Sequence, residues 1–125
     1  MSVNICNMLY IHNVAEVAEF WKAAGFVELK RQGEGQELTV VVAPSADSNA
    51  RLQLWDIDFI RKVSPEVAES KPSLLFTVEN LEAWHEKISK LAKTISAINE
   101  VPFKNFNFAD PDGNYYAFAE SELPS

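Results

Sequence analysis

Aromatic and polar side chains alternate with apolar ones along several strand-like runs of this chain. Successive side chains of a β-strand point to opposite faces of the sheet, so each run divides into two sets. One set is mixed in character and contains Cys6, Met8, Tyr10, Arg51, Gln53, Trp55, Ser73, Leu75, Thr77, Tyr115, Ala117 and Ala119. A face of this kind offers apolar area for burial and a few polar groups that orient a ligand. Such a face could line a small-molecule pocket, or it could be a second, partly solvated side of a sheet.

Trp55 is the strongest candidate for direct contact with a ligand. It shares the mixed face with Gln53, Tyr10 and Tyr115. These rings could hold a flat aromatic or cationic molecule by stacking and by cation–π contact. The alternative is that Trp55 packs in a dimer interface or against the loop that follows it. The residues that we expect to bind ligand are Met8, Tyr10, Gln53, Trp55, Ser73, Leu75, Tyr115 and Ala117.

Residues suited to nucleophilic or metal chemistry are few and scattered. His12 follows a strand-like run and His85 lies in a helical segment, and neither has the spacing of a metal ligand. A solvated or structural role is expected for both. Cys6 has no base near it in sequence, which favours a buried, small apolar role. Neither a glycine-rich phosphate loop nor a Gly-x-Ser-x-Gly elbow occurs, so we assign no catalytic residue.

The elements that hold these residues repeat once along the chain. Asn13 and Asn80 each follow a strand-like run and precede an apolar helical stripe, as N-cap residues do. Gly25 is expected to end the first helix, and Trp21 and Trp84 fall on the apolar sides of the two helices. Three strand-like runs follow each helix, at 27–30, 38–42 and 52–55 and then at 94–98, 106–108 and 115–118. The order β-α-β-β-β therefore occurs twice.

This repeat divides the chain into two modules of one α+β domain, residues 1–125. The first module covers about residues 1–56 and the second about 72–120. The linker, 57–71, is expected to contain a short helix or to act as a lid. The apolar strand face is expected to pack against the two helices; it contains Leu9, Ile11, Leu52, Leu54, Leu74, Phe76, Val78, Tyr116 and Phe118.

The segment 108–118 predicts a tight hairpin. Asp110 can cap the turn, Pro111 presets φ and Gly113 supplies a positive φ. This hairpin resembles the signature turn of the vicinal-oxygen-chelate superfamily, which contains glyoxalases, extradiol dioxygenases and bleomycin-resistance binding proteins. With the repeat, the resemblance extends over nearly the whole chain. It implies one curved, eight-stranded mixed sheet around a cleft, with the helices outside, and a homodimer.

The resemblance also indicates where a metal would bind in this superfamily. Its ligand positions fall on Cys6, Gln53, Ser73 and Ala117 of this chain. Alanine cannot bind a metal and serine is a poor ligand, whereas catalytic zinc takes about three protein ligands. We therefore expect no conventional metal site and no cofactor. The chain is most similar to the metal-free, bleomycin-resistance-like branch.

Composition restricts the class of protein further. The chain has 125 residues, 47% of them hydrophobic, which suits one domain with one core. Its net charge of −7 argues against binding to nucleic acid. No apolar run approaches the roughly 20 residues of a membrane span. The start of the chain does not resemble a secretory signal and there is one cysteine, so we expect a cytoplasmic protein.

Three functions remain open at this point. The first is a small-molecule binding protein of the bleomycin-resistance type that sequesters a cationic or aromatic compound. The second is a glyoxalase- or dioxygenase-like metal-dependent lyase or oxygenase with atypical ligands. The third is an interaction subunit whose mixed face binds another protein.

Overall fold

The computed structural model describes residues 5–121, and the chain forms two compact units. Unit 1 comprises residues 1–72 and unit 2 comprises residues 73–125. Each unit contains its own mixed sheet with at least one helix packed on it, so the chain is α+β as expected. The two units are described separately below.

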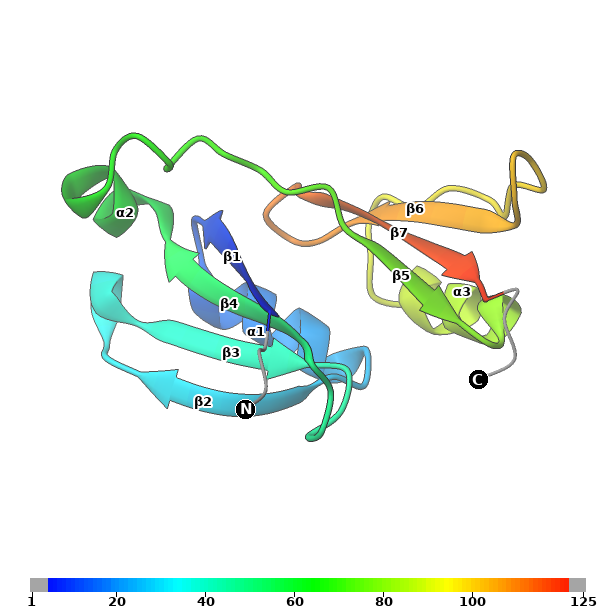
Figure 1. Cartoon of the computed structure of the whole chain (residues 1–125), viewed down its shortest axis with the longest axis horizontal. Coiled ribbons are helices and arrows are strands. Elements are labelled where there is room, and N and C mark those ends of the chain that lie inside the picture. The colour runs from blue at the N-terminus through cyan, green and yellow to red at the C-terminus, as the bar shows by residue number, and fades with distance from the viewer. Residues whose placement is uncertain (1–4, 122–125) are drawn as a thin grey trace. The chain divides into compact units, whose positions relative to one another are not determined.

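Unit 1 is built on a four-stranded sheet in the order β1-β4-β3-β2. Its elements are β1 (Ile5–Ile11), α1 (Val14–Ala23), β2 (Val27–Gln32), β3 (Thr39–Ala43), β4 (Ala50–Asp56) and α2 (Ile57–Val63). β1 and β4 run parallel, whereas the pairs β2/β3 and β3/β4 are antiparallel. Figure 1 shows α1 behind this sheet and α2 directly after β4. The linker therefore begins with a short helix, one of the two forms expected for it.

Local signals in the sequence set the ends of α1. The Asn13 side chain accepts a hydrogen bond from the Glu16 backbone N–H at 3.0 Å, which caps the first turn. At the other end, Gly25 has φ of 105° and its N–H donates to the Lys22 carbonyl. The Phe26 N–H reaches back to the Trp21 carbonyl, which completes a glycine-terminated helix end. Both predicted boundaries of this helix are confirmed.

One face of the unit 1 sheet forms the core with α1. The strand residues of this face are at most 2% exposed: Leu9, Ile11, Val40, Val42, Leu52 and Leu54. Trp21 of α1 is fully buried, with its ring 4.7 Å from that of Phe26. Burial of such side chains contributes about 1.5–3 kcal/mol each. The prediction that the apolar strand face packs against the helix is confirmed here, and the mixed face is left on the opposite side.

Unit 2 has a related but shorter order, β-α-β-β. Its elements are β5 (Leu75–Val78), α3 (Leu81–Ser89), β6 (Asn105–Ala109) and β7 (Tyr115–Glu120), and the sheet order is β5-β7-β6. The first and last strands, β5 and β7, run parallel, as β1 and β4 do in unit 1. Asn80 caps α3 by accepting from the Ala83 N–H at 3.1 Å. This shared pairing supports the repeat that the sequence predicts.

The core of unit 2 is mainly aromatic. Phe118 is 1% exposed, and the rings of Phe76, Trp84, Phe106 and Phe108 lie 5.1–5.5 Å from it. Trp84 is only half-buried, so its role in the core is partial.

One predicted strand is absent. The run 94–98 forms only an isolated bridge, between Ile95 and Phe108. The hydroxyl of Ser96 accepts from the Asn107 backbone N–H, so a side chain occupies a position that a strand would fill with backbone. None of the helices in residues 5–121 is long and apolar enough to cross a membrane.

Candidate ligand-binding site

Four of the predicted binding residues gather on the mixed face of unit 1. The parallel pairing of β1 with β4 sets Met8 opposite Gln53 and Tyr10 opposite Trp55. All four side chains are half-buried or exposed. Tyr10 and Trp55 are therefore paired across the two strands on an accessible surface.

A short polar network fixes this face. The amide of Gln53 donates to the Thr39 hydroxyl at 3.1 Å, and that hydroxyl donates to the Leu54 carbonyl at 2.9 Å. The Cys6 thiol donates to the side-chain oxygen of Gln53 at 3.8 Å. Thr39 was absent from the predicted site, although the alternation along 38–42 could have identified it.

Cys6 differs from its prediction. It is exposed rather than buried, because it lies on the edge strand β1 and faces away from the core. Partial burial of the sulfur raises the pKa of the Cys6 thiol, and the positive charge of Arg51 acts in the opposite direction. The register places Arg51 directly opposite Cys6. The thiol is therefore mainly neutral near pH 7.

The other four predicted residues lie in unit 2. Leu75 is paired with Ala117 across the parallel strands, and Tyr115 lies two residues before Ala117 on the same face. Ser73 precedes β5, since that strand begins at Leu75. Leu75 and Tyr115 are 52% and 60% exposed, so this face presents apolar surface. That the two sets of four residues form one site stays a prediction.

A hollow of about 420 Å³ lies on unit 2 beside this face. It is lined by Thr94, Ile95, Ser96, Asn107, Phe108 and Tyr115. Only Tyr115 belonged to the predicted set. Asn107 of β6 lies directly opposite Ala117 of β7. The alternation of side chains along 106–108 could have identified it as a site residue. Ile95 and Ser96 were harder to predict, because the run that contains them was assigned to a regular strand.

The hairpin after β6 holds a buried carboxylate. Asp110 is 5% exposed, and one of its oxygens accepts from the backbone N–H groups of Asp112 and Asn114 at 2.8 and 3.1 Å. The other accepts from the Tyr116 hydroxyl at 2.7 Å. Gly113 has φ of 87°. The predicted turn is confirmed, and its polar groups are used to build it rather than to bind a ligand.

Histidine plays no part in either face. The ring Nε2 of His85 lies 2.8 Å from the Ser96 carbonyl, with the ring edge-on to Phe106 at 4.9 Å. His85 is therefore structural, as expected. His12 is exposed.

The side chains at the superfamily's metal positions do not suit a metal ion. Ala117 carries no donor atom, and its partner across the strands is Leu75. Within residues 5–121, no three His, Cys, Asp or Glu side chains come together in an arrangement that could hold a metal. Catalytic zinc sites use about three such ligands. We therefore derive no chemistry through a metal.

Solved structures with the same architecture span nearly the whole chain. TnmS3, an antibiotic binding protein from Streptomyces sp. CB03234, has a TM-score of 0.77 at 19% identity over 98% of both chains. The bleomycin-binding protein from bleomycin-producing Streptomyces verticillus, complexed with copper(II)-bleomycin, has a TM-score of 0.67 at 20% identity, also over 98% of both. The chain shares the fold of these proteins.

Lactoylglutathione lyase from Agrobacterium tumefaciens shares the fold as well. Its TM-score is 0.73 at 15% identity, covering 97% of this chain and 95% of that one. Another neighbour is a member of the glyoxalase/bleomycin resistance protein/dioxygenase superfamily from Sphaerobacter thermophilus. The resemblance expected from the hairpin and the repeat is thus confirmed for the fold. No protein-family model matches the chain, and no curated protein matches it in sequence. Because this fold serves both binding proteins and enzymes, function has to be argued from the site.

Proposed function

We propose that this chain is a metal-free small-molecule binding protein of the bleomycin-resistance type, which sequesters a cationic or aromatic compound. The observation that carries the proposal is the pairing of Tyr10 with Trp55 on the accessible face of unit 1. Two aromatic residues paired across adjacent strands, beside the hydrogen-bonded amide of Gln53, suit the stacking and orientation of a flat ligand. Binding by sequestration needs no catalytic residue.

The fold supports this proposal without deciding it. Neighbours with the same architecture include an antibiotic binding protein and a bleomycin-binding protein. By analogy, we propose that the chain acts as one domain. We further propose that it works as a homodimer in the cytoplasm.

Isothermal titration tests the proposed function directly. The panel comprises basic glycopeptides, planar aromatic cations and neutral or acidic fused-ring compounds, with Trp fluorescence recorded in parallel. Saturable heat together with a change in Trp emission supports the proposal. Flat heats across the whole panel, with unmoved fluorescence, overturn it. Light scattering on the same sample measures the mass and so tests the dimer.

The alternative is a metal-dependent lyase or oxygenase with atypical ligands. The specific observation in its favour is that a lactoylglutathione lyase shares the fold. Its test is the metal content of the purified chain. Stoichiometric Zn, Ni, Mn or Fe that survives dialysis would place this alternative first.

A further inference from the structure

Arg51 also lies on the mixed face of unit 1. Stacking of an aromatic ligand on Trp55 and Tyr10 does not explain why an arginine is there. Arg51 is half-buried, and its Nε is enclosed with no hydrogen-bond partner. A buried N–H without an acceptor is destabilising, and more so on a charged group. Among residues 5–121 the guanidinium of Arg51 thus has no hydrogen-bond or ion-pair partner, and its N–H groups are available to an acceptor on a bound molecule.

The other two arginines show what a satisfied guanidinium looks like in this protein. Arg31 donates to both carboxylate oxygens of Glu28, at 2.9 and 3.1 Å. Arg61 bonds to Asp58 and to Glu69, at 3.1 and 3.0 Å. Within residues 5–121, Arg51 forms no ion pair, although the chain has 18 acidic residues.

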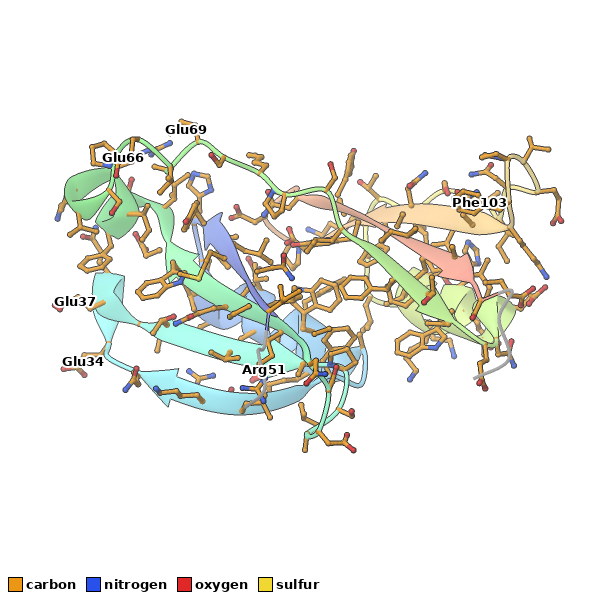
Figure 2. The ribbon with its side chains drawn as sticks, viewed as in Figure 1. Glu34, Glu37, Arg51, Glu66, Glu69 and Phe103 are labelled. Carbon is orange, nitrogen blue, oxygen red and sulfur yellow. The ribbon has the colours of Figure 1, made fainter. Side chains whose placement is uncertain are left out.

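Among the residues that the structure describes, none forms an ion pair with Arg51. Cys6 lies opposite, but its thiol is mainly neutral because burial raises its pKa. Asp47, in the turn before β4, accepts a hydrogen bond from Ser45 instead. In Figure 2 the labelled carboxylates Glu34, Glu37, Glu66 and Glu69 lie at the other end of unit 1, away from Arg51. Within residues 5–121, therefore, no ion pair compensates the charge of Arg51.

We propose that Arg51 binds the carboxylate of a fused-ring aromatic acid whose rings lie against Trp55 and Tyr10. The planar guanidinium can take a carboxylate through two parallel N–H···O bonds. Arg51 and Trp55 lie on one face of β4, four residues apart, or roughly 13 Å along the strand. The Arg51 side chain covers part of that distance, so a ligand as long as two or three fused rings fits better than a single ring.

This inference rests on the proposed function and narrows it to aromatic acids at this face. The probes are anthraquinone-2-carboxylate and its uncharged carboxamide, titrated by calorimetry. In the unmodified chain the acid binds at least about 10-fold more tightly than the amide, which is the low end of a charge-assisted bond. Arg51→Gln removes that preference and leaves the affinity of the amide within about 2-fold.

Arg61→Gln is the matched control, because it removes the same charge from a paired arginine of the same unit. It leaves the preference for the acid unchanged. Arg51→Lys keeps the charge without the planar fork, and we expect it to retain only part of the preference. Thermal melts of all three variants establish that each is folded.

Alkylation of Cys6 by iodoacetamide gives a second readout at the site itself, since the chain has one cysteine. Bound acid slows this reaction in the unmodified chain and in Arg61→Gln, but not in Arg51→Gln. Acid and amide binding equally, or protection that persists in Arg51→Gln, overturns the inference and leaves the proposed function standing. Absence of binding by both probes also overturns it, and flat titrations across the wider panel then remove the proposed function too.

Discussion

The indole nitrogen of Trp55 donates to the sulfur of Met8, 3.4 Å away across the parallel strands β4 and β1. The only polar atom of the indole therefore has its hydrogen-bond partner on the neighbouring strand of the same sheet. Tyr10 is the residue paired with Trp55 across the strands. An aromatic ring held at its edge loses little freedom when a ligand stacks on it, which favours affinity.

Replacing Trp55 by alanine is the direct test of this arrangement. Trp55 is half-buried on the accessible face, so its loss opens no cavity in the core. We expect Trp55→Ala to weaken ligand binding by about 1–3 kcal/mol, from lost stacking and buried area, with folding largely intact. Calorimetric titration measures the affinity and a thermal melt measures the fold. An unfolded or dissociated variant would mean that the ring supports structure instead.

Trp21 is the matched residue on the opposite face. It is fully buried and contacts Phe20 and Phe26, with ring centres 5.6 and 4.7 Å away. We expect Trp21→Ala to lower the free energy of unfolding by roughly 3–5 kcal/mol, because it leaves a cavity under α1. Affinity per folded molecule should change little. Urea unfolding and titration of the folded fraction separate the two quantities, and reduced affinity without lost stability would reverse our assignment of the two strand faces.

The sequence was sufficient for much of the fold because its signals there are local. Asn13, Asn80 and Gly25 mark helix ends through bonds within a few residues, and the turn at 110–113 is closed by its own side chains. Alternation along the strands separated the core face from the mixed face for the same reason. These patterns need no knowledge of distant residues.

The features that were missed depend on partners far along the chain. Ile95 and Ser96 have apolar and β-compatible neighbours, yet their strand is reduced to one bridge to Phe108. The exposure of Cys6 follows from the edge position of β1, which the sequence does not contain. The unpartnered state of Arg51 became visible only when the carboxylates around it could be located.

Metal-binding side chains can be introduced on β5 and β7 by mutation, which tests whether these positions could form a metal site. Leu75, rather than Ser73, lies directly opposite Ala117. We expect Leu75→His with Ala117→Glu to bind a divalent ion more tightly than Ser73→His with Ala117→Glu. Both should bind weakly, since outer partners that orient ligands contribute about 10–100-fold in affinity and were never built. Equilibrium dialysis with Zn²⁺ or Ni²⁺ measures this, and a folded Leu75→His pair that binds no more metal than the unmodified chain shows that the two positions do not converge.

The buried pair of Asp110 and Tyr116 predicts a pH effect on stability. Burial raises the pKa of the Asp110 carboxyl, although hydrogen bonds from Tyr116 and from the turn oppose that rise. The folded chain therefore holds this proton more firmly than the unfolded chain. The contribution is fully present below the unfolded pKa of about 3.9 and is lost as pH rises through the higher folded value.

We therefore expect the free energy of unfolding of the unmodified chain, relative to Asp110→Asn, to fall as pH rises from about 3 to 7. Tyr116→Phe, which removes the 2.7 Å hydrogen bond, should cost about 1.5–3 kcal/mol while the carboxyl is charged. Urea titrations of all three chains at several pH values measure both effects. If the unmodified chain instead gains stability over Asp110→Asn as pH rises, the hydrogen bonds outweigh burial and the folded pKa of Asp110 is lowered.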